Sequence, residues 1–401
     1  MNLRALTLGP LPPNPGGGSI SRGQILNGLA QSGAAICVLA PISTAALKDG
    51  DWFAARHPDL RIIRYWLPTL SQEIRPPKGH QDVVELERVQ VHRLAKELVR
   101  SFRPNLLIAG RERHAALTRE LARELALPWC LWLRGVLTGE IVSGVAPKSK
   151  AAQFLDLIQS ADLVISVAEH LAAGLDRSYG ITGIPTIPNA IDADTFRPQS
   201  ISTARRAEFG IPNGHAAVLL PGVLVEHKRP MDVLRAAELV IQRDPAVVFL
   251  LAGEGPLEDA LAEFCRDRGM ADHIRFLGPV PYDCMPALYN AVDIVVMASD
   301  SEGLSRVYLE ALACGRTLLA SDIPGAREVI EDGQNGFLFP LGDQQALADR
   351  LLALLGNDAL RQSVGPVARA SVSDRSVERS VGMYSRTLHR FLNGKENMPT
   401  S

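Results

Sequence analysis

The stretch Ser299–Gly315, S-D-S-E-G-L-S-R-V-Y-L-E-A-L-A-C-G, joins a strand-like segment to a helix-like segment. The apolar run Ile294–Met297 before it predicts a buried strand, and the apolar spacing after Ser305 predicts a helix. Amide groups in the first turn of a helix lack intrahelical partners. Those near Gly303 to Arg306 are therefore expected to bind phosphate.

Two acidic residues, Glu302 and Glu310, bracket the start of this helix. Glu310 lies in the otherwise apolar run V-Y-L-E-A-L-A, where a carboxylate is costly unless it has hydrogen-bond partners. The hydroxyls of a bound sugar would be such partners. Taken alone, the two residues equally fit a favourable charge at a helix start for Glu302 and a hydrogen-bonded core carboxylate for Glu310.

The same alternation of apolar strands and helices continues along the whole chain, which indicates parallel sheets covered on both faces. Strands are expected at Leu3–Leu8, Ala35–Leu39, Arg61–Tyr65, Asn105–Ala109, Trp129–Leu133, Leu163–Ser166, Pro185–Ile187, Ala217–Leu220, Val247–Leu251, Ile274–Phe276, Ile294–Met297, Thr317–Ala320 and Gly336–Phe339. Helices are expected at Gln24–Gln31, Val83–Phe102, Ala115–Leu125, Met231–Arg243, Leu257–Arg268, Val307–Cys314, Gln344–Leu355 and Val377–Leu392.

The loop-like segment Ile187–Pro198, I-P-N-A-I-D-A-D-T-F-R-P, interrupts the alternation. It divides the chain into two doubly wound α/β domains, residues 1–190 and 191–376. The last helix, Val377–Leu392, has no strand after it and could pack back on the first domain. Ligands of such sheets bind beyond the carboxyl ends of the strands, so two facing domains would form a cleft there.

Composition narrows the class of protein. The 401 residues are 46% hydrophobic and 21% charged, as in a globular protein, and the formal net charge of −2 argues against a nucleic-acid binder. No apolar run reaches the roughly 18 residues that a membrane-spanning helix needs. The five cysteines are scattered, without a C-x-x-C motif, which favours reduced thiols in a cytoplasmic protein.

The segment from Glu302 to Gly315 resembles the E-x7-E signature of the retaining glycosyltransferases of family four, which have the GT-B fold. In that family the pattern E-G-(F/L)-x5-E-A-(M/L)-A-C-G is common. Other segments of the chain resemble the family as well: Ala161–Leu171, Ile187–Phe196, Leu250–Pro256 and Phe276–Val280.

The resemblance implies a nucleotide-sugar site in the second domain. Glu310 would bind the ribose hydroxyls, and Glu302 would hold hydroxyls of the donor sugar. The base would stack near Val280. Backbone groups would contact the diphosphate or the sugar at Gly303, Leu304 and Ser305.

Lys228, in P-G-V-L-V-E-H-K-R-P, matches the family lysine that binds the donor diphosphate. A leaving nucleoside diphosphate gains charge as the glycosidic bond breaks, and a fixed cation offsets that charge. The family places an arginine where this chain has Val223. Arg229 or Arg306 is the hypothetical substitute for the missing cation.

The first domain offers three further candidate groups. Gly17 and Gly18, with Gly16, follow the first strand, where family members carry glycines near the donor phosphate and the acceptor. Arg134 occupies the place of the family histidine in P-W-C-L-W-L-R-G; an arginine stays charged and cannot act as a general base near neutral pH. Arg111 and His114 follow another strand and are candidates for acceptor binding.

The resemblance implies a retaining glycosyltransferase that uses a UDP-sugar rather than a GDP-sugar, without a metal or other cofactor. The expected partners are the nucleotide sugar and an acceptor, either a saccharide, a lipid-linked glycan or a small molecule, and peripheral contact with a membrane is a further option. One alternative is another enzyme of the same fold, a nucleotide-sugar epimerase or a sugar phosphorylase. The other is a catalytically silent nucleotide-sugar-binding protein, which is considered because Val223 and Arg134 depart from the family pattern.

Overall fold

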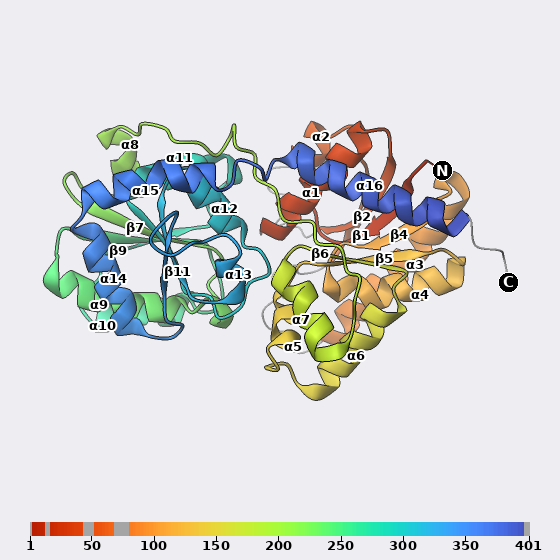
Figure 1. The fold of residues 1–401 in the computed structure, drawn as a ribbon, viewed down its shortest axis with the longest axis horizontal. Helices are drawn as coiled ribbons and strands as arrows, with labels where there is room; N and C mark the ends of the chain where they lie inside the picture. Colours follow the sequence, from red (N-terminus) through yellow and green to blue (C-terminus); the bar gives the residue numbers. More distant parts are fainter. Residues whose placement is uncertain (1, 13–16, 43–51, 68–79, 397–401) are drawn as a thin grey trace. The chain divides into compact units, whose positions relative to one another are not determined.

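The computed structural model describes residues 2–12, 17–42, 52–67 and 80–396, and it divides into two compact units. The first unit comprises Met1–Asn189 and Val377–Ser401, and the second comprises Ala190–Ser376. Each unit is an α/β layer structure built on one parallel sheet of six strands (Figure 1). Gly16, part of the predicted glycine group, lies outside the described residues.

The first unit has the strand order β3-β2-β1-β4-β5-β6. Its strands are apolar and largely buried, because helices cover both faces of the sheet. The strands are β1 (Arg4–Leu8), β2 (Ala35–Ile42), β3 (Arg61–Trp66), β4 (Leu106–Ala109), β5 (Trp129–Leu133) and β6 (Leu163–Ser166). The helices are α1 (Gly17–Gln31), α2 (Trp52–Arg56), α3 (His80–Phe102), η3 (Glu112–His114), α4 (Ala115–Leu125), α5 (Val136–Val142), α6 (Lys148–Ser160), α7 (Glu169–Tyr179) and α16 (Val377–Glu396).

The second unit repeats this arrangement with the strand order β12-β11-β10-β7-β8-β9. Its strands are β7 (Ala216–Pro221), β8 (Val247–Ala252), β9 (Ile274–Gly278), β10 (Ile294–Met297), β11 (Thr317–Ser321) and β12 (Phe337–Phe339). Its helices are α8 (Thr203–Glu208), η4 (Glu226–Lys228), α9 (Pro230–Arg243), α10 (Glu258–Asp267), η5 (Tyr282–Cys284), α11 (Met285–Ala291), α12 (Arg306–Ala313), α13 (Pro324–Arg327), α14 (Gln344–Leu355) and α15 (Asp358–Ala370).

The C-terminal helix α16 belongs to the first unit, although it follows the second unit in sequence. Val381, Tyr384 and Leu388 are buried in the same core as α1 and β1. The ring of Tyr384 packs on Trp132 of β5, with 4.6 Å between the ring centroids. The cover over this face of the first sheet therefore includes a helix from the far end of the chain.

One predicted strand, Pro185–Ile187, is wrong. Thr186 forms only an isolated bridge with Ser166. The amide of Ile187 donates to the carbonyl of Ser166, but Pro185 and Pro188 have no amide hydrogen to extend the ladder. The sequence analysis did not anticipate eight of the α-helices in the described part of the chain: α2, α5, α6, α7, α8, α11, α13 and α15.

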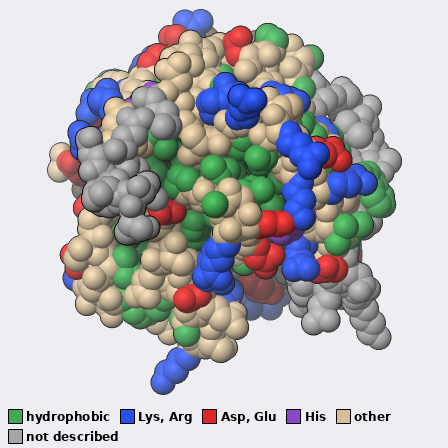
Figure 2. All heavy atoms as spheres, turned by 90° about the vertical axis from the view of Figure 1, so that its right-hand side faces the viewer, with side chains coloured by type: hydrophobic (Ala, Val, Ile, Leu, Met, Phe, Trp, Pro, Cys, Tyr) green, Lys and Arg blue, Asp and Glu red, His purple; other side chains and the backbone are tan. Residues whose placement is uncertain are grey.

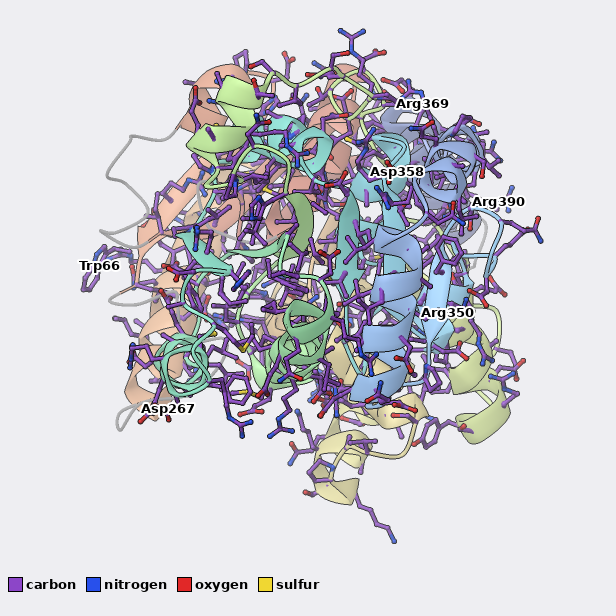
Figure 3. All side chains as sticks on the ribbon, turned by 90° about the vertical axis from the view of Figure 1, so that its left-hand side faces the viewer. Trp66, Asp267, Arg350, Asp358, Arg369 and Arg390 are labelled. Carbon is purple, nitrogen blue, oxygen red and sulfur yellow. The ribbon has the colours of Figure 1, made fainter. Side chains whose placement is uncertain are left out.

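The surface mixes both signs of charge with apolar side chains. On the face shown in Figure 2, Lys and Arg lie beside Asp, Glu and hydrophobic groups, as expected from the formal net charge of −2. Trp66, at the end of β3, is 51% exposed and projects away from the ribbon (Figure 3). The five cysteines are free thiols, and Cys284 alone among them is not fully buried.

Candidate functional site

The order of the second sheet reverses between β7 and β10, which lie side by side. In open α/β sheets, ligands bind outside the carboxyl ends of the strands at such a switch point. The segments that follow these two strands contain Lys228 and Glu302, respectively. The amide of Asp300 donates to the carbonyl of His227 at 2.9 Å, which ties the two segments together.

Lys228 and Glu302 form an ion pair at this switch point, between Nζ and Oε1. The Lys228 side chain is 20% exposed and that of Glu302 is 10% exposed. Ser299 supports the carboxylate, because its hydroxyl donates to the same Oε1 at 2.8 Å. The Ser321 hydroxyl in turn donates to the Ser299 carbonyl. The fold thus holds a cation and an acid side by side, largely out of solvent.

Glu310, on α12, is buried, and both of its carboxylate oxygens have protein partners. Arg306 reaches Oε1 with Nη2 at 3.0 Å and with Nε at 3.1 Å. The hydroxyl of Tyr289, on α11, donates to Oε2 at 2.9 Å. Arg306 also donates to the hydroxyl of Tyr282 at 2.6 Å, and its guanidinium lies 5.5 Å from the centre of that ring.

The electrostatics of this group follow from its burial. Burial raises the pKa of the Glu310 carboxyl, and the Arg306 charge and the Tyr289 hydroxyl only partly offset that effect. Burial alone would lower the pKa of Arg306, but Tyr282 and Glu310 raise it above the ordinary value. Burial also raises the pKa of Tyr282 to about 12. Each carboxylate oxygen has two lone pairs, so Glu310 retains the capacity to accept further hydrogen bonds.

The backbone between Glu302 and α12 is packed closely against α13. A Cβ placed on Gly325 would lie 2.7 Å from the Glu302 carbonyl oxygen and 2.9 Å from that of Gly303. Only glycine fits there without a backbone shift. Gly303, Leu304 and Ser305 are buried, and Ser305 precedes α12 in extended conformation without capping it through its side chain.

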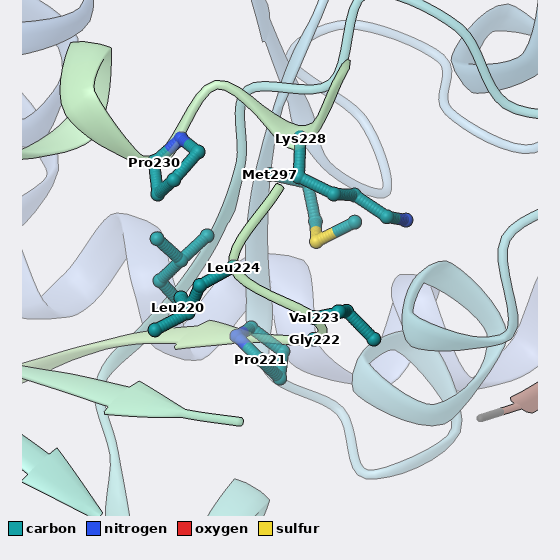
Figure 4. A pocket seen from close by; sticks show the side chains of 8 residues that line it. All are labelled: Leu220, Pro221, Gly222, Val223, Leu224, Lys228, Pro230 and Met297. Atoms are coloured by element: carbon teal, nitrogen blue, oxygen red, sulfur yellow. The ribbon is translucent and has the colours of Figure 1, made fainter. Parts of the chain in front are cut away.

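A small pocket lies between the ends of β7 and β10, and Lys228, Val223 and Met297 are among its lining residues (Figure 4). Arg229 leaves the 3₁₀ turn η4 with a left-handed φ of 50° and pairs with Asp232 at 2.5 Å. Val280 is half-buried after β9. Both candidates for the missing cation, Arg229 and Arg306, therefore have acidic partners in the second unit.

The first unit places Arg134 at the carboxyl end of β5. Its Nη2 donates to the Ser21 hydroxyl at 2.7 Å and to Asn189 Oδ1 at 2.6 Å. The backbone amides of Arg134 and Gly135 donate to Glu112 Oε1 at 3.0 and 2.6 Å. Glu112 thus fixes the turn after β5, and Arg134 is held in a defined position by neutral side-chain groups.

The remaining candidates of the first unit follow β1 or β4 in the sequence. A Cβ on Gly18 would lie 2.9 Å from Arg111 Nη2, so Gly18 and Arg111 are in close approach. Gly17 is the first residue of α1. His114 is 1% exposed, and its Nε2 lies 3.6 Å from Glu87 Oε1, too far for a hydrogen bond. Burial lowers the pKa of His114.

The sequence analysis missed the residues that hold the candidate side chains in place. These are Tyr282, Tyr289, Ser299, Ser321 and Gly325 in the second unit, and Ser21, Asn189 and Glu112 as supports in the first. The buried Glu310 signalled that partners were needed, but the sequence did not indicate which tyrosine supplies one.

Comparison with known proteins gives a family similarity for the second unit. Residues 202–371 match the model of the family described as glycosyl transferases group 1. This region lies within the second unit, Ala190–Ser376. The matched region contains Lys228, Glu302 and Glu310 of the second unit.

One relative of the chain is a D-inositol 3-phosphate glycosyltransferase of Nocardia farcinica, 31% identical over 61% of the chain and 57% of the relative. An N-acetyl-alpha-D-glucosaminyl L-malate synthase of Bacillus anthracis is 27% identical over 60% of the chain and 62% of the relative. The alignments thus span less than two thirds of the curated relatives they match.

Similarity to solved structures shows that the chain has the GT-B fold. HepE from Anabaena, solved in complex with UDP and glucose, has a TM-score of 0.78 at 20% identity; the match covers 96% of the present chain and all of HepE. Sucrose-phosphate synthase from Thermosynechococcus elongatus has a TM-score of 0.76 at 18% identity and covers 98% of the present chain and all of its own.

The described part of the chain lacks two features, a membrane-spanning helix and a metal site. No helix within it has the length and apolar character to cross a membrane. No group of three or more His, Cys, Asp or Glu side chains within it is arranged to hold a metal ion.

Proposed function

We propose that this chain transfers a sugar from a nucleotide-diphosphate sugar to an acceptor, with retention of the anomeric configuration. The observation that carries the proposal is the Lys228–Glu302 ion pair at the switch point between β7 and β10. A cation and an acid fixed together at the ligand-binding edge of a sheet suit a substrate that bears both a diphosphate and a sugar.

Lys228 would act on the leaving diphosphate. Charge grows on that group as the glycosidic bond breaks, and a preorganised ammonium group stabilises it. The donor would take the place of Glu302 as the nearest partner of Nζ. Glu302 would then accept hydrogen bonds from hydroxyls of the donor sugar, with Ser299 keeping the carboxylate in place.

Glu310 would accept hydrogen bonds from the ribose hydroxyls at Oε2, where Tyr289 also donates, since Oε1 already accepts from both Nη2 and Nε of Arg306. The backbone at Gly303, Leu304 and Ser305 would contact the diphosphate or the sugar. The base would stack near Val280. Arg229 would assist the diphosphate only after exchanging its Asp232 partner for the donor.

Arg134 would contribute charge and position rather than proton transfer, because a guanidinium cannot accept a proton near neutral pH. In the retaining route the leaving phosphate takes the proton of the acceptor hydroxyl, so no protein base is needed. Gly17 and Gly18 would approach the donor phosphate, and Arg111 with His114 would serve the acceptor.

UDP is the proposed nucleotide, supported by the structural similarity to HepE, whose structure contains UDP and glucose. The named relatives act on phosphorylated inositol and malate, which supports a saccharide or small-molecule acceptor. The proposal needs no metal ion, because Lys228 supplies the cation at the diphosphate. The free cysteines support a cytoplasmic location.

The proposal is tested by thermal unfolding of the full chain with UDP-glucose, UDP-N-acetylglucosamine, UDP-galactose and GDP-mannose. The correct donor is expected to raise the midpoint, since a ligand that binds the native state stabilises it. Slow release of UDP or GDP from that donor, with EDTA present, would then report bond cleavage without a metal.

The outcomes separate the candidate functions. Stabilisation followed by sugar transfer or donor hydrolysis supports the transferase. Conversion of the donor sugar without any acceptor would show an epimerase instead. Stabilisation with neither reaction, in every acceptor tested, would show a silent nucleotide-sugar-binding protein. A phosphorylase would release sugar phosphate when inorganic phosphate is added.

A further inference from the structure

Four arginines of the first unit surround the loop after β1 and the first turns of α1. Arg22 Nη1 donates to the Pro10 carbonyl at 2.9 Å, and Arg64 reaches the carbonyls of Leu11 and Pro12. Arg134 contacts Ser21, the residue before Arg22. Arg111 approaches α1 at Gly18, one turn earlier. We call Arg22, Arg64, Arg111 and Arg134 the arginine cluster.

The cluster sits at the switch point of the first sheet. The strand order reverses between β1 and β4, which pair in parallel from Ala5 with Leu106 to Leu8 with Ala109. The residues beyond their carboxyl ends are Gly9 to Pro12 and Gly110 to Arg111. This is the position at which open α/β sheets bind ligands. It is also the position that corresponds, in the second unit, to Lys228 and Glu302.

Glycines bring the arginines close to both strand ends. A Cβ on Gly110 would lie 2.2 Å from Arg22 Nε, and a Cβ on Gly9 would lie 2.6 Å from Arg22 Nη1. A side chain at Gly9 or at Gly110 would displace the Arg22 guanidinium. The backbone at this edge of the sheet is therefore shaped around a buried arginine.

Arg22 is the most informative member of the cluster. Its side chain is 1% exposed, and its hydrogen-bond acceptors in the described chain are the Pro10 carbonyl and the Thr7 hydroxyl, both neutral. Its Nε has no partner among the described residues. No carboxylate of the described chain pairs with it. Buried charges in proteins are normally paired, so the counter-charge of Arg22 must come from elsewhere.

The neighbouring charges increase this imbalance. Burial, together with the positive charges of Arg134 and Arg111, lowers the pKa of Arg22 to about 9. Arg64 acts in the same direction. Arg111, Arg64 and Arg134 are each partly exposed, so a ligand can reach them from solvent while Arg22 lies behind.

We propose that the arginine cluster binds an anionic group, phosphate or carboxylate, carried by the acceptor. This inference rests on the proposed function, since it assigns the anion to the acceptor of the transfer. Arg111 and Arg134 would contact the anion directly, as guanidinium groups bind such oxygens in pairs of hydrogen bonds. Arg22 would supply positive charge from beneath without touching the ligand.

The experiment uses the full chain and two simple anions. The unfolding midpoint is measured against inorganic phosphate, and separately against succinate, with and without saturating UDP and with ionic strength held constant by sodium chloride. We expect a saturable rise that chloride does not produce. We expect the rise to persist in UDP, which occupies the donor diphosphate position. The anion with the larger effect identifies phosphate or carboxylate as the preferred group.

Two variants and a control locate the effect. Arg111→Gln and Arg64→Gln are each expected to weaken anion binding by about tenfold or more, because each removes a charge-assisted hydrogen bond or a nearby charge. Arg119→Gln, on α4, is the matched control; Arg119 pairs with Asp156 and lies outside the cluster. Unchanged UDP stabilisation in each variant establishes that it folds.

Several results would overturn the inference. One is the absence of a saturable anion effect, and another is an equal effect in Arg111→Gln and Arg119→Gln. A third is loss of the effect when UDP is bound, which would assign the anion to the donor diphosphate. Failure of the proposed function looks different: UDP and the nucleotide sugars would leave the midpoint unchanged, while the anion effect and its sensitivity to Arg111→Gln would remain.

Discussion

Charged residues lie at equivalent positions beside the two sheets, but the partners of these residues differ. At the switch point of the second sheet, Lys228 pairs with Glu302, Arg229 with Asp232, and Arg306 with Glu310. At the switch point of the first, the buried Arg22 has only neutral hydrogen-bond partners among the described residues. The same fold therefore contains one site of paired charges and one buried arginine whose partners among the described residues are neutral.

The difference indicates two kinds of ligand recognition. A site of paired charges can exchange partners, so that a ligand with both acidic and hydroxyl groups takes over contacts already formed within the protein. A buried arginine with neutral hydrogen-bond partners carries an energetic cost that a bound anion would reduce. The four predictions below alter one side of this comparison at a time.

The largest effect is expected from Arg306→Met. Removal of the guanidinium leaves the buried Glu310 carboxylate with the Tyr289 hydroxyl as its donor among the described residues. Breaking a buried pair by removing one member costs about 3–5 kcal/mol. Urea unfolding would measure the loss. The control, Arg243→Met, breaks only an exposed pair with Asp349 and should cost less than about 1 kcal/mol. Equal losses in both variants would contradict the importance of the buried pair.

Lys228→Ala is expected to lower turnover by about 100- to 1000-fold, the usual cost of removing one group that stabilises charge in the transition state. The steady-state rate with the donor identified by thermal unfolding provides the measurement. Donor affinity should change much less than turnover. A Lys228→Ala variant as active as the parent protein would show that Lys228 takes no part in the reaction. The control is Lys150→Ala, because Lys150 forms an exposed ion pair with Glu140.

Glu310→Ala is expected to weaken UDP-glucose binding by about 10- to 100-fold, from the loss of hydrogen bonds to a charged group. Binding should also depend on pH. Because burial raises the pKa of Glu310, the carboxyl begins to take up a proton at a higher pH than usual, and affinity should fall as the pH is lowered. Calorimetric titration between pH 8 and 5 tests both points. The exposed Glu263→Ala should keep the parent affinity and pH profile.

Arg22→Met is expected to give the smallest change in stability, within about 1 kcal/mol of the parent, since apolar replacement of a buried charge is often neutral or favourable. The pH dependence has a defined sign. The folded-state pKa of Arg22, about 9, lies below the ordinary 12.5, so its charge destabilises the fold below pH 9 and this penalty is relieved as the pH rises above 9.

The stability difference between the parent and Arg22→Met should therefore shift in favour of the parent above pH 9. Urea unfolding at pH 7 and pH 10 measures this shift. A large loss of stability at pH 7 would show that Arg22 is held by a counter-charge in the free protein, and the contrast between the two sheets would then disappear.

Sequence patterns predicted the framework well because it depends on local signals. The runs at Trp129–Leu133, Leu163–Ser166 and Ile294–Met297 coincide with β5, β6 and β10, since continuous apolar segments of this length can be satisfied only inside a covered sheet. The prediction for Pro185–Ile187 was wrong: the segment is short, contains the polar Thr186, and begins with a proline that has no amide hydrogen for strand pairing.

The site was predictable only in part. Glu302 and Glu310 stand out from their apolar surroundings, and Lys228 from its place after a strand. Tyr289 and Arg22 gave no such signal: a tyrosine in α11 and an arginine in α1 look like ordinary helical residues. Their contacts join elements far apart along the chain, so they become visible only when the sheet order is known.

The docking of α16 on the first unit has a consequence for the order of assembly. Val381, Tyr384, Leu388 and Leu392 of α16 complete a core whose other buried residues come from the first 190 positions of the chain. A ribosome makes α16 only after it has synthesised the entire second unit. The second unit can therefore reach its native state before α16 is made, whereas part of the apolar interior of the first unit stays uncovered until then.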